Sequence, residues 1–345
     1  MRIIIDAMGG DHAPAAVVAG AVRAARTVDA ELVLVGRGAE ILQELEKNGI
    51  QNLPKGMEIA HAEDVVDMHD DPATVVRKRR DSSMVAGLRM LAEDKGDAMI
   101  SAGSTGALLA ASTLIVKRIP GIRRAAMAPI LPTAGGKCVL IDCGANAEST
   151  PEFLLQFACM GSFYAQSVLG IEQPRVGLLN IGTEDTKGTE LQRQAYGLLQ
   201  NLSEAGGIRF IGNIEARSVM AGLADVVVAD GFSGNILLKS IEGTAKFMSD
   251  QMKQIFLRNA ATKLSAVFCR KGIADLKRMM DYREVGGTPF LGITKPIIKA
   301  HGSSDALAIC NAVRQAADAV RADLASAIEA HMHLMTIPKE LEHAE

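Results

Sequence analysis

The chain has 345 residues, 37 basic and 40 acidic side chains and a formal net charge of -3. Aromatic residues make up only 3% of it and tryptophan is absent, which argues against nucleic-acid binding, since that needs basic patches and usually stacking side chains. The five cysteines are scattered without a CxxC pair, so we expect reduced thiols and a cytoplasmic protein.

Short apolar runs alternate with helical segments along the chain. Eight runs predict strands, at 3–5, 32–35, 57–60, 98–100, 139–141, 176–179, 208–211 and 226–229. This alternation is typical of βαβ units and predicts a Rossmann-like α/β fold, with a mostly parallel sheet and helices on both faces. We expect one catalytic domain over residues 1–345, with a basic helical insertion at about 246–285.

Polar segments containing glycine follow five of these strands. They are 6–11, 101–106, 142–146, 180–184 and 230–235. Because ligands of open α/β sheets bind at the carboxyl ends of strands, we expect these segments to form one site. Their candidate substrate-binding residues are Asp6, Gly9, Gly10, Asn146, Asn180, Glu184 and Gly234.

One of these segments has the pattern of a phosphate cradle. Ser104, Thr105 and Gly106 precede a predicted helix over 107–116, where backbone amides and hydroxyls can bind an anion. A plain N-cap by Ser104 or Thr105 is the alternative interpretation. The segment at 230–235 repeats the pattern before a helix that begins near residue 236.

Two further loops carry candidate charged or proton-transferring groups. Lys187 lies between acidic residues in a loop, as a candidate partner for phosphate or an oxyanion, although a solvated lysine is the alternative. His301, Ser303 and Asp305 lie too close in sequence to form a catalytic triad without a strained elbow, and GxSxG is absent. We expect Ser303 or Ser304 to cap the following helix and bind an anion.

Helices are predicted at 153–169 and at the C-terminal end of the chain, and two apolar stretches have to be tested as membrane spans. The one at 153–169 is apolar nearly all round, so we expect it in the core of a two-fold dimer interface. The apolar stretches 98–116 and 153–171 contain too many small polar residues to favour membrane spans. A final amphipathic helix is predicted over about 304–330, and the last dozen residues are expected to fray.

The segment 246–278 is basic and amphipathic, with eight Lys or Arg and two Asp. Its predicted tip combines apolar and basic side chains: Leu257, Arg258, Lys263, Val267, Phe268, Arg270 and Lys271. Such a tip fits an acidic carrier protein or an anionic membrane, and a solvated helix packed on its own subunit is the alternative.

Several cofactor motifs are missing. The glycines at 36–41 lack the third glycine of a dinucleotide fingerprint, and neither GxxxxGK[ST] nor HExxH occurs. His331 and His333 could chelate a metal ion, but exposed side chains are the better interpretation. We therefore expect no metal and no nucleotide cofactor.

Seven ordered motifs together resemble a known family. They are MGGDHAP at 8–14, RRDSS at 79–83, SAGSTG at 101–106, DCGAN at 142–146, NIGTEDTKG at 180–188, DGFSGN at 230–235 and KAHGSSD at 299–305. They closely resemble the acyl-acyl carrier protein:phosphate acyltransferases of bacterial phospholipid synthesis. The resemblance implies transfer of a long-chain acyl group from the carrier protein to inorganic phosphate. It also implies a homodimer with a fold like the isocitrate/isopropylmalate dehydrogenases and phosphate acetyltransferases.

This resemblance sets expectations for the site and its partners. Lys187 and Asn235 are expected to contact phosphate and the thioester carbonyl oxygen, and His301 to protonate the leaving thiolate. The product would feed a downstream glycerol-3-phosphate acyltransferase, with the protein held peripherally on the inner face of the cell membrane. Three different functions stay open: a short-chain acyl-CoA:phosphate acyltransferase, a decarboxylating hydroxyacid dehydrogenase and a non-catalytic membrane-associated lipid-binding protein.

Overall fold

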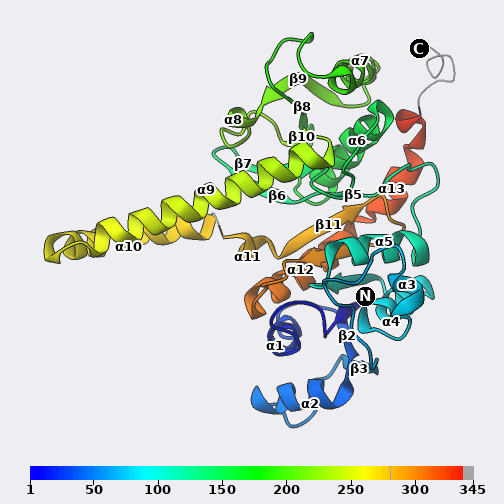
Figure 1. Ribbon diagram of the computed structural model, residues 1–345, viewed down its shortest axis with the longest axis vertical. Helices are drawn as coiled ribbons and strands as arrows, with labels where there is room; N and C mark the ends of the chain where they lie inside the picture. Colours follow the sequence, from blue (N-terminus) through cyan, green and yellow to red (C-terminus); the bar gives the residue numbers. More distant parts are fainter. Residues whose placement is uncertain (280, 337–345) are drawn as a thin grey trace.

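The computed structural model describes residues 1–279 and 281–336, and its strands form two sheets (Figure 1). One sheet contains β1 (Arg2–Asp6), β2 (Glu31–Gly36), β3 (Met57–His61), β4 (Ala98–Ser101), β5 (Ala126–Met127), β11 (Gly287–Leu291) and β12 (Ile297–Ala300). The other contains β6 (Ile130–Thr133), β7 (Gly136–Ile141), β8 (Arg175–Asn180), β9 (Arg209–Glu215) and β10 (Val226–Val228). Their orders are β3-β2-β1-β4-β12-β11-β5 and β6-β7-β10-β8-β9.

The α/β class and all eight predicted strands are confirmed. The division into two sheets was not visible in the strand pattern. The four strands that were missed, β5, β6, β11 and β12, lie where the parallel βαβ repeat breaks. There β11 runs antiparallel to both β5 and β12, and β6 runs antiparallel to β7.

Helices cover both faces of the sheets. They are α1 (Ala15–Ala24), α2 (Gly38–Lys47), α3 (Val75–Lys78), α4 (Ser83–Ala92), α5 (Thr105–Ile115), α6 (Pro151–Ser167), α7 (Glu190–Glu204), α8 (Ala216–Val219), α9 (Gly231–Leu257), α10 (Ala260–Met279), α11 (Tyr282–Val285), α12 (Ala306–Ala322) and α13 (Leu324–Ala330), followed by the 3-10 helix Met332–Met335. Side chains cap several of them. Ser82, Thr150, Asp230 and Asp305 accept backbone N–H groups at the starts of α4, α6, α9 and α12.

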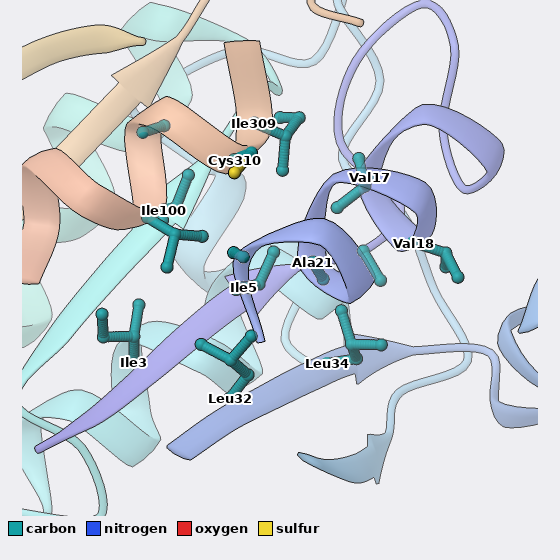
Figure 2. Packing of buried hydrophobic residues seen from close by; sticks show 14 of the residues in the cluster. Ile3, Ile5, Val17, Val18, Ala21, Leu32, Leu34, Ile100, Ile309 and Cys310 are labelled. Atoms are coloured by element: carbon teal, nitrogen blue, oxygen red, sulfur yellow. The ribbon is translucent and has the colours of Figure 1, made fainter. Parts of the chain in front are cut away.

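Successive side chains of β1 point to opposite faces of the sheet, so this strand contributes to two hydrophobic cores. Ile3 and Ile5 pack under α1 and α12 together with Leu32 and Leu34 of β2 (Figure 2). Ile4 points to the opposite face, in the cluster that includes α4 and α5. Burying an aliphatic side chain of this size stabilises the fold by about 1.5 to 3 kcal/mol.

One short stretch of chain belongs to both sheets. The chain passes from β5 directly into β6 through Ala128 and Pro129. The Ala128 N–H donates to the Pro289 carbonyl of β11 at 3.1 Å, and the Leu140 N–H of β7 donates to the Pro129 carbonyl at 3.0 Å. This bridging segment, residues 126–133, ties the two sheets together through the backbone.

The expectation that the apolar helix lies in a dimer interface is wrong for its core side chains. Phe157 and Tyr164 of α6 are fully buried within the single chain. Helix α6 packs on β7 and β10, and α7, α13 and the 3-10 helix Met332–Met335 also contact it. A helix covered by its own chain on all sides needs apolar residues all round, which is the pattern that the sequence shows.

The basic segment forms an arm that projects from the body of the molecule (Figure 1). It consists of α9 and α10, which pack on each other, and no described residue of α10 is buried. The break between them falls at Asn259, whose side chain accepts the Thr262 N–H at 2.9 Å. The helical insertion predicted there is therefore made of two helices, of which α9 begins well before it.

The C-terminal helix is also divided. Asp323, at a φ of 43°, separates α12 from α13. Residues 337–345, within the tail expected to fray, lie outside the described residues. In the part of the chain that the structure describes, no helix is both long and apolar enough to cross a membrane.

Candidate active site

A cleft of about 570 Å³ is lined by the ends of strands from both sheets. Asp11, Thr105 and His301 follow β1, β4 and β12 of the first sheet. Gly144 and Asn235 follow β7 and β10 of the second. Four of the five polar strand ends predicted to form one site therefore line one cleft, together with the segment at 299–305. The fifth, at 180–184, does not line the cleft.

The rest of the cleft wall is mostly apolar. Its larger apolar residues are Met68, Met127, Pro129, Ile130, Leu131, Pro132, Met220, Leu238, Ile241, Ala245, Met279 and Val285, and the polar side chains Lys239, Glu242, Asp281, Thr288 and Lys299 also line the cleft. On α9 the lining residues run from Asn235 to Ala245, about 15 Å along the helix axis. The cleft thus joins a polar end to an extended apolar wall.

Glycines allow α9 to begin against the loop after β7. A Cβ on Gly234 would lie 1.9 Å from the Asp142 carbonyl oxygen, and one on Gly231 would lie 2.2 Å from that of Asn146. Only glycine fits at such a close approach of two backbones. Gly234, predicted to bind substrate, thus packs the helix start, which brings Asn235 beside Gly144.

Asp142 organises this loop and was missed as a functional position. Its buried carboxylate accepts the N–H groups of Met127 at 2.8 Å, Cys143 at 2.6 Å and Asn146 at 2.7 Å. Burial raises the pKa of Asp142, whereas these hydrogen bonds oppose that rise. Asn146, predicted to bind substrate, donates from Nδ2 to Asp142 and to the Ala125 carbonyl, and does not line the cleft.

Asp6 has a similar anchoring position on the other side. It is buried and accepts hydrogen bonds from the hydroxyls of Ser83 and Ser101, both at 2.6 Å. Burial raises its pKa. Gly9 lies against this carboxylate, and Gly10 has a φ of +107°. Asp6, Gly9 and Gly10 therefore shape the loop that carries Asp11 to the cleft and do not line it themselves.

The predicted phosphate cradle opens partly onto the cleft. Thr105, the first residue of α5, lines it, and so does the neighbouring Gly103. Ser104 is buried and its side chain makes no capping hydrogen bond. Gly106 faces Pro72 instead of the cleft. The helix N-terminus is thus presented without a side-chain cap from Ser104.

His301 has a defined proton arrangement. Its Nδ1 accepts the Ser303 backbone N–H at 3.2 Å and lies 2.8 Å from the Ser303 hydroxyl. Because Nδ1 accepts, the ring proton is on Nε2. Burial, and then the charges of Lys239 and Lys299, lower the pKa of His301 below its usual value, so the ring is neutral at pH 7.

The expected caps of α12 are corrected by the structure. Asp305 accepts the Ala308 N–H at 3.0 Å and is the N-cap. Ser303 contacts His301 instead, and the Ser304 hydroxyl is buried without a hydrogen-bond partner among the described residues.

Lys187 lies in a separate network at the end of β8. Its side chain is half-exposed, 3.9 Å from Glu184, and does not line the cleft. Asn180 Nδ2 donates to the Lys187 carbonyl at 3.1 Å, and Asn213 Nδ2 donates to the Glu184 carbonyl at 2.7 Å. Asn180, Glu184 and Lys187 therefore lie together, but apart from Asn235 and His301.

Two lysines that sequence reasoning did not assign line the cleft. Lys239 is exposed and pairs with Glu242 at 2.8 Å, whereas Lys299 is buried. The signal for Lys299 was its position inside the apolar run 297–300, which a central strand buries.

The side chains predicted for the tip of the arm are exposed, although the arm ends at the turn near Asn259, and Val267 and Phe268 lie about two turns into α10. Phe268 has 82% of its surface accessible and Val267 has 65%. Leu257, Arg258, Lys263, Arg270 and Lys271 are exposed as well. Across residues 1–279 and 281–336, none of these basic residues forms an ion pair, and no group of three His, Cys, Asp or Glu could hold a metal ion.

Comparison with known proteins gives a consistent result. The sequence model of a family described as "Fatty acid synthesis protein" matches residues 1–327. The chain is 45% identical over 335 residues to a phosphate acyltransferase of Thermoanaerobacterium thermosaccharolyticum, covering 97% of this chain and 98% of the relative. It is 48% identical over 334 residues to a phosphate acyltransferase of Geobacillus thermodenitrificans, covering 96% and 99%.

The fold is also found among solved structures. A phosphotransacetylase from Streptococcus pyogenes matches with a TM-score of 0.61 over 93% of this chain and 94% of that one. Their sequences are 18% identical, so this similarity concerns the fold.

Proposed function

The chain belongs to this fatty acid synthesis protein family, whose curated relatives are acyltransferases, and from that premise we propose that it transfers a long-chain acyl group from acyl carrier protein to inorganic phosphate. The product is an acyl phosphate for phospholipid synthesis. The observation that carries this proposal is the cleft, which joins a polar end suited to an anion to an apolar wall suited to an acyl chain.

The chemistry needs no nucleophilic side chain. An oxygen of HPO₄²⁻ attacks the thioester carbonyl carbon, the C–O bond forms and the C–S bond breaks. The proton of HPO₄²⁻ moves to the sulfur of the departing thiol. The products are an acyl phosphate dianion and a neutral thiol, so atoms and charge balance. The protein has to hold both substrates in line and stabilise the oxyanion of the tetrahedral state.

The lining side chains divide these tasks. Asn235 donates from Nδ2 to the carbonyl oxygen, and Thr105 with the first amides of α5 binds phosphate. His301 is neutral with its proton on Nε2, so its part is a hydrogen bond to the leaving sulfur instead of full protonation. The predicted phosphate contact of Lys187 requires its loop to approach the cleft, and the Lys187→Met variant tests it.

The length of the apolar wall favours a long-chain donor over a short-chain acyl-CoA. An acetyl group would leave most of the wall between Leu238 and Ala245 uncovered, whereas a long acyl chain buries apolar surface along it. A hydroxyacid dehydrogenase would form no acyl phosphate, and neither would a non-catalytic lipid-binding protein.

The deciding experiment is a lipid-free assay of the purified protein. It compares palmitoyl-carrier protein, shorter acyl-carrier proteins and acetyl-CoA as donors, with phosphate as acceptor and acyl phosphate trapped as the hydroxamate. We expect acyl phosphate from the long-chain carrier protein. Transfer from acetyl-CoA alone would reassign the donor, and no acyl phosphate from any donor would contradict the proposal.

The cellular arrangement follows from the same proposal. We place the enzyme in the cytoplasm as a homodimer, with the arm tip touching the inner face of the cell membrane. There it would pass acyl phosphate to the downstream glycerol-3-phosphate acyltransferase. The exposed apolar and basic side chains of the tip support this placement.

A further inference from the structure

Lys299 is a buried cation at the polar end of the cleft. It lies in β12, paired with Ser101 of β4 on one side and Thr288 of β11 on the other. Only 7% of its surface is accessible, yet it lines the cleft. A lysine is almost never buried unless a partner satisfies its charge.

The partners of Lys299 within the chain carry no formal charge. Its Nζ donates to the Ala102 carbonyl at 3.2 Å and also to the Ala300 carbonyl. Within the described ranges it forms no ion pair with a carboxylate. An ammonium has three N–H donors, so two carbonyls leave one donor for a ligand.

The two nearest carboxylates, Asp6 and Asp11, form no ion pair with Lys299 in the described part of the chain. Asp6 and then Asp11 raise the pKa of Lys299, but Asp6 accepts hydrogen bonds from the hydroxyls of Ser83 and Ser101, and Asp11 lies at the cleft wall. Burial is the larger influence and lowers that pKa to about 8. The lysine is therefore charged at neutral pH in a site where an anion would complete its coordination.

The other basic side chains that line the cleft are already paired or neutral, so Lys299 is the cation available to bind an anion at its polar end. Lys239 is paired with Glu242, His301 is neutral at pH 7, and the carboxylate of Asp281 is paired with Arg283. Ala102 and Gly103, which line the cleft beside Thr105, follow the strand that pairs with Lys299. The ammonium and the start of α5 thus border the same end of the cleft.

We propose that Lys299 binds the phosphate acceptor, donating its third N–H to a phosphate oxygen beside the start of α5. This assignment rests on the proposed function. It makes Lys299, a strand residue, the cation that pairs with phosphate, in place of the loop residue Lys187. The competing interpretation is that Lys299 only fastens β4 to β12 through the two carbonyls.

Four variants separate these roles. Lys299→Met removes the charge but keeps an unbranched side chain, and Lys299→Arg keeps a permanent charge. Lys187→Met tests the lysine favoured by the sequence. Lys295→Met is the matched control, because Lys295 also borders β12 but pairs with Asp94 outside the cleft.

Steady-state kinetics and calorimetry with inorganic phosphate provide the readout. Losing one charge-assisted hydrogen bond should weaken phosphate binding by roughly 10- to 100-fold in Lys299→Met, with the KM for the acyl donor little changed. Lys295→Met should match the unaltered enzyme. A purely structural role predicts a lower Tm with an unchanged KM for phosphate and would overturn the proposal, as would a phosphate defect confined to Lys187→Met.

A pH titration of the unaltered protein decides the case if Lys299→Met does not fold. Phosphate binding should weaken as the pH rises above about 8, because the ammonium loses its charge while phosphate stays a dianion. The other charged groups that face the cleft are Asp11, Asp281, Glu242 and the exposed Lys239, with Asp6 buried behind them, and His301 has a lowered pKa.

Lys299→Arg should bind phosphate equally above and below pH 8, which separates the two lysines. Phosphate affinity of the unaltered protein that stays constant to pH 9.5 would overturn the proposal. If the unaltered protein forms no acyl phosphate at all, the proposed function fails. If it forms acyl phosphate and Lys299→Met has an unchanged KM for phosphate, only the role of Lys299 fails.

Discussion

Asn235 lies one turn into α9 and is positioned by backbone contacts, not by its own side chain. Gly231 and Gly234 let the helix start press on the loop after β7, which fixes the amide beside Gly144. A donor placed in advance of the reaction is worth most in the tetrahedral state, where charge develops on the carbonyl oxygen.

We therefore predict that Asn235→Ala lowers kcat by about 10²- to 10³-fold. Thermal unfolding should show the Tm of the unaltered protein, because this side chain lies at an exposed position. Asn235→Asp is the companion variant, which keeps the shape but removes the donor. A kcat close to that of the unaltered enzyme in both variants would remove Asn235 from the site.

Cys143 lines the cleft but is not equipped to act as a nucleophile. Burial raises the pKa of its thiol to about 12, so it stays protonated at neutral pH. Cys143→Ala should retain acyl transfer, measured with the long-chain donor and checked by circular dichroism for folding. A folded but inactive variant would instead indicate a thioester on the enzyme.

Several residues predicted for the site line the cleft because motif and strand end coincide. Thr105, Asn235 and His301 each follow a strand that the pattern identified or lie in a motif that resembles the family, and all three line the cleft. Sequence reasoning could not separate ligand contacts from anchors. Asp6 and Asn146 look like site residues in the sequence, but their partners are distant in the chain, at Ser83 and Ala125.

At the scale of elements, α9 has two different parts. Its first turns line the cleft with Asn235, Leu238, Ile241 and Ala245, and its remainder projects as half of the arm. Helix α9 thus connects the apolar wall of the cleft to the exposed end of the arm.

Ala245 is the last residue of α9 that lines the cleft, so its size should limit the chain that fits. We predict that Ala245→Trp shifts the preferred donor toward shorter acyl chains, because the indole occupies space that the end of a long chain would fill. The measurement is kcat/KM across carrier proteins loaded with different acyl groups. Thr244→Trp, one residue earlier and outside the cleft, is the control, and an identical profile for both would contradict the placement of the chain.

The arm tip has a composition that fits an anionic lipid surface. Four basic residues near such a surface contribute about 1 kcal/mol each, and Val267 and Phe268 can enter it shallowly. We predict that the native protein pellets with vesicles containing phosphatidylglycerol, less at high salt, and that Val267→Asp combined with Phe268→Asp abolishes this.

The soluble assay with carrier protein is run on the same pair of proteins. Equal pelleting of both would eliminate a membrane role for the tip. Loss of soluble transfer in the folded double variant would assign the tip to the carrier protein. The apolar spacing of this segment identified its helices in advance, but the turn at Asn259 depends on a local cap with Thr262 that periodicity does not reveal.

At the scale of the whole molecule, the burial of α6 bears on which surface would join two chains in a homodimer. The core side chains of α6 are covered within one chain, so a dimer must use other residues. We predict that sedimentation velocity at micromolar concentration gives a mass near twice that of the 36.5 kDa chain. A species of single-chain mass at that concentration would contradict the homodimer.

The architecture was predictable as a class but not as an arrangement. Buried parallel strands appear in the sequence as apolar runs such as 3–5 and 139–141, because both faces of such strands are covered. Strands β5 and β11 pair at the edge of the seven-stranded sheet, and β5 has only two residues. Nothing in so short a run distinguishes a strand from a loop, so the edge of the seven-stranded sheet, where the chain passes into the second sheet, was not predicted.

The bridging segment at residues 126–133 has a consequence for how such a cleft can change over time. Since Ala128 and Pro129 hydrogen-bond to strands of different sheets, the width of the opening at this edge is set by main-chain geometry, which every sequence shares. Substitutions at Ile130, Leu238 or Ala245 can therefore alter which molecule fits without altering the distance between the walls. A lineage could exchange one acyl donor for another by side-chain replacements alone, while the scaffold that aligns the reacting groups is inherited intact.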